Sequence, residues 1–209
     1  MQTTVRFITP AAPRRRERPP TGDRWVHEVK FDGYRIQLHK HGRDVKLLSK
    51  SGHDFTDRFP AIASIARSLP ARSAILDGEL VACSKTGLPD FYKLLLSRAD
   101  PGELCLWAFD LLHLNGADLV DQPLKSRKAK LEKLLDRHNS PFVLFSESFG
   151  DPLRLLDACE ARRLEGIVSK RIDAPYRSGT STDWIKVKCL TWREANKERG
   201  ELFNKDKRR

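Results

Sequence analysis

A lysine beside a glycine turn is the first feature of this 209-residue chain that could do chemistry. Lys30-Phe31-Asp32-Gly33-Tyr34-Arg35 places Lys30 at the end of a predicted strand, with a second cation, Arg35, five residues later. A lysine amine is a nucleophile only when it is neutral, and burial or neighbouring cations lower its pKa from about 10.4 toward that condition. Taken alone, the motif favours a surface lysine beside a hairpin.

Two further lysines share one side of a predicted strand near the end of the sequence. In Trp184-Ile185-Lys186-Val187-Lys188, the two-residue period of a strand puts Lys186 and Lys188 on one face and the apolar Ile185 and Val187 on the other. If the apolar pair faces the core, the two ammonium groups converge on one spot, as binding of a phosphate requires. An amphipathic strand with solvated lysines explains the pattern equally well.

Three other residues have a possible role in binding a nucleotide. Glu165 stands before a predicted strand and could hold Mg²⁺, which takes carboxylates plus phosphate oxygens; its alternative is a turn residue. Glu79 could accept hydrogen bonds from a ribose or be only a hairpin acid. Phe109 could stack on a base, although core packing is the more usual role of such a residue.

The elements that must position these residues are predicted from hydrophobic periodicity and turn signals. Asp32-Gly33, Asp77-Gly78 and Asn115-Gly116 are typical of turns between strands. Strands are expected over 25–30, 34–39, 45–49, 74–76, 80–83, 104–112, 166–171 and 184–189, and helices over 59–69, 89–97, 125–138, 152–163 and 192–203. Because strands and helices do not alternate strictly, the sequence predicts an α+β fold with mixed or antiparallel sheets.

Charge and composition indicate the kind of partner. The 39 Lys and Arg exceed the 28 Asp and Glu, which gives +11 and favours an anionic partner, nucleic acid first and acidic lipid second. Residues 1–22 hold five Arg against one Glu, and residues 191–209 hold seven Lys or Arg against four acids. These ends are either solvated runs or arms that neutralise phosphates.

Several classes of protein are not expected. No apolar stretch approaches the about 20 residues of a membrane span, and no apolar leader is recognisable, so neither a membrane protein nor a secreted one is predicted. The cysteines form no CxxC pair, which disfavours a zinc site or disulfide framework and fits a reducing bacterial cytoplasm. They are Cys83, Cys105, Cys159 and Cys189.

The identity and order of these motifs carry more information than any one of them. Lys-x-Asp-Gly-x-Arg, Asp-Gly-Glu, Phe-Asp-Leu-Leu-His-Leu-Asn-Gly, Glu-Gly-Ile-Val-Ser-Lys and Trp-Ile-Lys-Val-Lys follow one another from Lys30 to Lys188, and the likeness that they carry covers residues 7–190. The series resembles that of covalent nucleotidyltransferases, most of all ATP-dependent DNA ligases and the ligase module of bacterial end-joining ligases. The resemblance implies an ATP-grasp-like adenylation domain over 23–190, a basic proline-rich leading segment over 1–22 and a basic tail over 191–209.

The resemblance also implies a reaction and a role for each site residue. Lys30 would attack the α-phosphate of ATP to give lysyl-AMP, AMP would pass to the 5′-phosphate of a nick, and the 3′-hydroxyl would displace it. The metal, Mg²⁺, would be held by Glu165, and cations would help to keep Lys30 deprotonated. The implied nucleotide-binding residues are Glu28 at the base edge, Phe109 and Val168 on the two faces of adenine, Arg35 and Glu79 at the ribose, Lys186 and Lys188 at the α-phosphate, Lys170, and Lys50, which stands where these ligases usually carry Arg.

The expected partner is nicked or broken double-stranded DNA, together with a DNA end-binding or repair protein. About twenty residues follow the last motif, so no OB-fold domain is expected in this sequence. Two alternatives remain open: an RNA ligase or other polynucleotide nucleotidyltransferase, and a non-catalytic DNA-binding adaptor.

Overall fold

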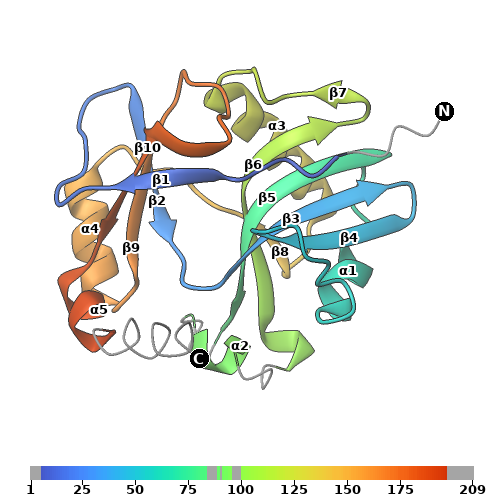
Figure 1. Ribbon diagram of the computed structural model, residues 1–209, viewed down its shortest axis with the longest axis horizontal. Helices are drawn as coiled ribbons and strands as arrows, with labels where there is room; N and C mark the ends of the chain where they lie inside the picture. The colour runs from blue at the N-terminus through green and yellow to red at the C-terminus, as the bar shows by residue number, and fades with distance from the viewer. Residues whose placement is uncertain (1–5, 84–88, 90, 96–99, 197–209) are drawn as a thin grey trace, which may run out of the picture.

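Two β-sheets form most of the structure, a computed structural model that describes residues 6–83, 89, 91–95 and 100–196 (Figure 1). The four-stranded sheet has the order β1 (Ala11–Arg15), β10 (Gly179–Lys188), β9 (Gly166–Arg171) and β2 (Trp25–Lys30). The six-stranded sheet runs β4 (Asp44–Ser49), β3 (Tyr34–His41), β5 (Ser73–Ala82), β6 (Leu104–Leu114) and β7 (Ala117–Asp118), and β8 (Val143–Phe145) also pairs with β6. The β1–β10 and β6–β8 pairs are parallel and the others antiparallel, which confirms the α+β class with mixed sheets.

Helices cover the outer faces of the two sheets. The helices are α1 (Pro60–Ala66), α2 (Phe91–Leu95), the short 3₁₀ helix η1 (Pro101–Glu103), α3 (Leu124–His138), α4 (Pro152–Ala161) and α5 (Leu190–Ala195). Helix α4 lies against the four-stranded sheet, and α3 lies against β6 (Figure 1). The predicted start of α4 is confirmed, because the Asp151 carboxylate accepts from two backbone N–H groups of the first turn, each at 3.0 Å. None of the helices in these described ranges is long and apolar enough to cross a bilayer.

Two of the three predicted turns are wrong. Asp32-Gly33 does not close a hairpin, because β2 and β3 lie in different sheets and the segment carries the chain from one to the other. Gly33 is needed there for a close approach: a Cβ at this position would lie 2.2 Å from the carbonyl oxygen of Leu80 on β5.

The second Asp-Gly lies inside a single strand rather than between two. β5 continues through Asp77 and Gly78, with a register shift against β6 at this point. A Cβ on Gly78 would lie 2.8 Å from the carbonyl oxygen of Trp107, so glycine is again required by a neighbouring strand. The third turn is confirmed, since Asn115 and Gly116 have positive φ values of 50° and 93° and join β6 to β7.

The ends of the chain are only partly described. The helix predicted over 192–203 is α5, which begins at Leu190 and ends at Ala195, and residues 197–209 lie outside the described ranges. The helix predicted over 89–97 corresponds to α2, and residues 96–97 are likewise not described. Part of the basic leading segment forms β1, the edge strand that pairs with β10 in the four-stranded sheet (Figure 1).

Candidate active site

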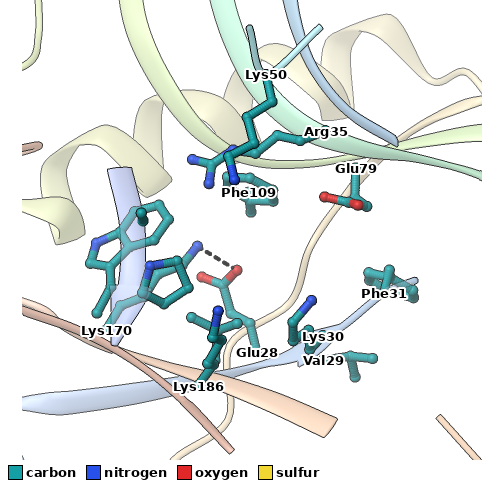
Figure 2. A pocket seen from close by; sticks show the side chains of 14 residues that line it. Glu28, Val29, Lys30, Phe31, Arg35, Lys50, Glu79, Phe109, Lys170 and Lys186 are labelled. Carbon is teal, nitrogen blue, oxygen red and sulfur yellow. Dashed lines mark hydrogen bonds and ion pairs between the residues drawn. The ribbon is translucent and has the colours of Figure 1, made fainter. Parts of the chain in front are cut away.

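A pocket of about 230 Å³ opens between the two sheets. Side chains of the four-stranded sheet line one side of it, and side chains of the other sheet face them (Figure 2). Nine residues predicted from the sequence line this one pocket: Glu28, Lys30, Arg35, Lys50, Glu79, Phe109, Val168, Lys170 and Lys186. The structure therefore brings together residues that lie up to 158 positions apart in the sequence, from Glu28 to Lys186.

Glu165 joins the predicted nucleophile to a second lysine. The Lys30 Nζ lies 2.7 Å from Glu165 Oε2, and the Lys188 Nζ lies 2.8 Å from Oε1 of the same carboxylate. Gly166 is the first residue of β9 and has a φ of 147°. A Cβ on Gly166 would lie 2.0 Å from the carbonyl oxygen of Val187 on β10, so only glycine allows β9 to begin this close to β10. A side chain at this position would move Glu165 away from both lysines.

The charge state of Lys30 differs from the expectation. Burial by itself would lower the pKa of Lys30, but the carboxylates of Glu165 and Glu79 outweigh it, and the pKa is raised above its ordinary value. The prediction that neighbouring cations keep Lys30 deprotonated is therefore wrong for this arrangement of side chains.

Glu165 fits the role of a single protein ligand for Mg²⁺. Within the described ranges, no group of three or more His, Cys, Asp and Glu side chains forms a cage for a metal ion. Mg²⁺ is commonly bound by one or two carboxylates together with substrate phosphates and water. The carboxylate of Glu165 suits that pattern, provided that one of its two lysine partners moves away from the oxygen that binds the metal.

A buried charge cluster lies at one end of the pocket. Glu28 is 2% exposed, and its two oxygens lie 2.8 Å from Lys128 Nζ and 2.8 Å from Lys170 Nζ (Figure 2 shows the second contact). Burial raises the pKa of Glu28, but the two lysines outweigh it and lower the pKa overall. Burial lowers the pKa of Lys170 to about 8.

Lys128 is a residue that the sequence interpretation missed. Its Nζ also donates to the carbonyl oxygen of Ser146 at 2.7 Å, so one ammonium group ties α3 and the segment after β8 to the pocket. Lys128 stands 100 residues from Glu28 on an amphipathic helix, where its pattern is that of any solvated lysine.

Aromatic rings form the adjoining wall. Phe109 and Trp184 meet edge to face with 5.9 Å between ring centroids, and the Lys170 Nζ lies 4.3 Å from each centroid. Val168 lines the same pocket, next to Lys186 and Glu28 in the strand register.

The guanidinium of Arg35, which lines the pocket, is held by the carboxylate of a buried residue. Its Nε and Nη2 donate to the two oxygens of the buried Asp77 at 3.0 and 2.6 Å, and its Nη1 donates to the carbonyl oxygen of Ala11 at 2.5 Å. The Tyr176 hydroxyl donates to Asp77 at 2.6 Å. Most donors of Arg35 are thus engaged within the protein, and its contact with a ribose stays a prediction.

Glu79 differs from the other acids of the pocket. Its carboxyl faces the pocket (Figure 2), and the pKa is raised to about 7, chiefly by burial and further by Glu165 and Asp77, against the pull of Lys30 and Arg35. The carboxyl is thus poised to change charge near neutral pH.

The pocket wall includes residues that the sequence interpretation did not assign to it. Ala12 and Pro13 of β1 close one side, and Phe31 lines another and stacks on Trp107 with 4.8 Å between centroids. The proline-rich composition of the leading segment concealed the fact that it contains a strand.

A family model and two similar proteins all relate this chain to DNA ligases. The family model for the ATP dependent DNA ligase domain matches residues 18–188. The multifunctional non-homologous end joining protein LigD of Pseudomonas aeruginosa is 40% identical over 176 residues, covering 83% of this chain and 21% of that protein. A probable DNA ligase of a Nocardioides species is 38% identical over 172 residues, covering 80% of this chain and 34% of that protein. The chain thus spans about a fifth and a third of the lengths of these relatives.

Solved structures agree with this assignment. The ligase domain of LigD from M. tuberculosis superposes with a TM-score of 0.76 at 27% identity, over 87% of this chain and 60% of that chain. The mycobacterial DNA ligase D complexed with ATP and MES gives a TM-score of 0.72 at 28% identity with the same coverage. The similarity confirms the nucleotidyltransferase fold.

Proposed function

The chain belongs to the ATP-dependent DNA ligase family, and we propose that its pocket attaches AMP from ATP to Lys30 as the first step of sealing breaks in DNA. The observation that carries the proposal is the position of Lys30 Nζ, 2.7 Å from Glu165 and in one pocket with Glu28, Phe109 and Val168. Residues 23–190 would form the adenylation domain, with β1 of the leading segment completing its wall.

In the proposed first step, Lys30 Nζ attacks the α-phosphorus of ATP. The N–P bond forms while the bond from phosphorus to the bridging oxygen of pyrophosphate breaks, and pyrophosphate leaves with that electron pair. The amine must first lose a proton, and Glu165 Oε2 is the acceptor beside it at 2.7 Å. Mg²⁺ held by Glu165 and the phosphates would offset phosphate charge and make the neutral amine of Lys30 more accessible.

Other side chains would bind and orient the nucleotide. Lys186 and Lys188 share a strand face and would hold the α-phosphate. Lys50 lies across the pocket from Lys186 (Figure 2). Phe109 would stack on adenine, and the fixed carboxylate of Glu28 would accept from its amino group. AMP would then pass from Lys30 to a DNA 5′-phosphate, and the 3′-hydroxyl would displace it to join the strand.

The proposal is tested by incubating the protein with α-labelled ATP and Mg²⁺ and resolving the products on a denaturing gel. We expect label on the wild type and on the control Lys46→Ala, whose side chain is 67% exposed on β4, and none on Lys30→Ala. A wild type without label, or equal labelling of Lys30→Ala, refutes the adenylation proposal and leaves the DNA-binding adaptor.

A second experiment, which compares sealing of nicked DNA with sealing of nicked RNA, identifies the nucleic acid substrate. Family membership favours nicked or broken duplex DNA over RNA, and the end-joining relative favours a DNA end-binding or repair protein as a partner. Labelled protein should therefore seal a nicked DNA duplex faster than the matching nicked RNA, and the reverse preference would indicate an RNA ligase.

A further inference from the structure

One row of cross-strand neighbours runs over the whole four-stranded sheet and ends on an arginine. Glu28 on β2 pairs with Val168 on β9, Val168 pairs with Lys186 on β10, and Lys186 pairs with Arg15 on β1. Paired residues on adjacent strands point to the same face of a sheet. Glu28, Val168 and Lys186 line the pocket. Arg15 is not one of the lining residues, but the strand register continues their row to it on the edge strand β1.

Within the described ranges, Lys50 and Lys186 in the pocket and Arg15 beside it differ from the other cations there. Lys30, Lys170, Lys188 and Arg35 each have a carboxylate within 2.8 Å. Among the described residues, neither Arg15 nor Lys186 has an ion-pair partner. Two adjacent cations that the protein leaves without a carboxylate suit an anionic ligand.

The backbone of β1 is fixed beside the pocket although the Arg15 side chain is exposed. The Ala11 N–H donates to the Tyr176 hydroxyl at 2.9 Å, and the N–H of Arg16 donates to the carbonyl oxygen of Lys186 at 3.0 Å. Arg15 therefore lies between two segments of backbone that are hydrogen-bonded to the rest of the fold. The strand that carries Arg15 is thus held next to β10, the strand of Lys186.

The in-line geometry of phosphoryl transfer indicates which phosphates of ATP would lie near the β1 edge of the sheet. The attacking and leaving atoms lie in line through phosphorus, so pyrophosphate leaves on the side away from Lys30 Nζ. Lys30 is on β2, and the sheet order β2, β9, β10, β1 puts Lys186 and then Arg15 on the far side (Figure 1). We propose that Arg15, beside Lys186, forms the subsite for the β- and γ-phosphates of ATP, and so for the leaving pyrophosphate; this inference rests on the proposed function.

Arg15 would then offset the negative charge that pyrophosphate gains when the P–O bond breaks. Arg14 supplies a matched control, because it is an exposed arginine on the same strand but pairs with Ile185, whose side chain is buried and points away from the pocket-lining lysines. Arg14→Ala removes the same charge from the same strand while leaving the proposed subsite intact.

The test measures binding of ATP, AMP and inorganic pyrophosphate by calorimetry, using the full chain in EDTA so that no adenylation occurs. Arg15→Ala should weaken ATP and pyrophosphate about tenfold, equivalent to about 1.4 kcal/mol, and leave AMP within twofold of the wild type. Arg14→Ala should leave all three affinities within twofold. Circular dichroism of both variants checks that the fold is kept.

Other outcomes overturn the inference. Equal losses in Arg14→Ala and Arg15→Ala would show a general effect of charge, and an equal loss for AMP and ATP would show a distorted pocket. Weaker binding of nicked duplex with unchanged ATP and pyrophosphate affinities would make Arg15 a DNA contact. If Lys30 is labelled by ATP but Arg15→Ala binds ATP and pyrophosphate as the wild type does, only this inference is refuted. If Arg15→Ala loses that affinity but the wild type is not labelled, only the adenylation proposal is refuted. A wild type that binds none of the three ligands refutes both.

Discussion

Ionisation of Glu79 in the pocket is expected to lower the free energy of unfolding, and a single substitution can measure by how much. Its carboxyl is half-buried beside Lys30 and Arg35, and burial together with Glu165 and Asp77 raises its pKa from 4.5 to about 7. Glu79→Gln keeps the shape of the side chain and removes its charge. We expect the substitution to stabilise the protein at alkaline pH and to have much less effect at acidic pH.

The direction of this pH dependence follows from the difference in the pKa of Glu79 between the folded and the unfolded chain. Below about pH 4.5 the carboxyl of Glu79 is protonated in both the folded and the unfolded chain, so its contribution to stability is fully present. As the pH rises toward 7, the unfolded chain ionises first and stability is lost, until the loss is complete above the folded pKa. At 1.36 kcal/mol per pKa unit the loss is at most about 3.4 kcal/mol, and partial exposure to solvent reduces it to about 2 kcal/mol.

Urea unfolding at pH 5 and pH 8, in EDTA, measures this effect. The stability of Glu79→Gln relative to wild type should rise by about 1.5 kcal/mol between the two pH values, because part of the loss already falls below pH 5. The control is Glu132→Gln, which removes a carboxyl from the exposed side of α3. A relative stability of Glu79→Gln that is equal at pH 5 and pH 8 would refute the reasoning.

Three other perturbations have defined outcomes. Lys128→Met should remove one of the two lysine partners of Glu28 and lower stability by about 2 kcal/mol; in a thermal melt, a midpoint within 1 °C of the wild type would contradict this. Gly33→Ala puts a Cβ 2.2 Å from a backbone oxygen of β5 and should cost about 2–3 kcal/mol in urea unfolding, whereas Gly150→Ala, which meets nothing within 4 Å, serves as control and should cost under about 1 kcal/mol. Deletion of 191–209 should weaken binding of nicked duplex and reduce its salt dependence in a titration from about 50 to 200 mM salt; an unchanged salt slope would mark these residues as a solvated run.

The faces of the last strand of the site could be predicted from the sequence. Strand alternation predicted that Ile185 and Val187 face the core, and they are 1% and 2% exposed. The same rule placed Lys186 and Lys188 together on the other face, because a period of two follows from the backbone of any strand. Local rules of this kind need no knowledge of the rest of the chain.

Local signals failed where a distant strand decided the conformation. Asp32-Gly33 and Asp77-Gly78 have the composition of hairpin turns, yet both glycines are required because another strand passes within 3 Å of the position of a Cβ. For Gly33 that strand lies 47 residues later, at Leu80. A dipeptide carries the same propensity whether its glycine supplies a turn or a close approach, so the sequence could not distinguish the two.

The sequence by itself determined which side chains could do the chemistry, because their types, order and strand alternation are properties of short segments. Only the tertiary structure decided how those side chains are charged and partnered. Glu28 is fixed by Lys128 from 100 residues away, and Lys30 is held by Glu165 from 135 residues away, which raises the pKa of Lys30 rather than lowering it. Burial and ion pairing depend on distances in space, and those exist only once the two sheets have closed around the pocket.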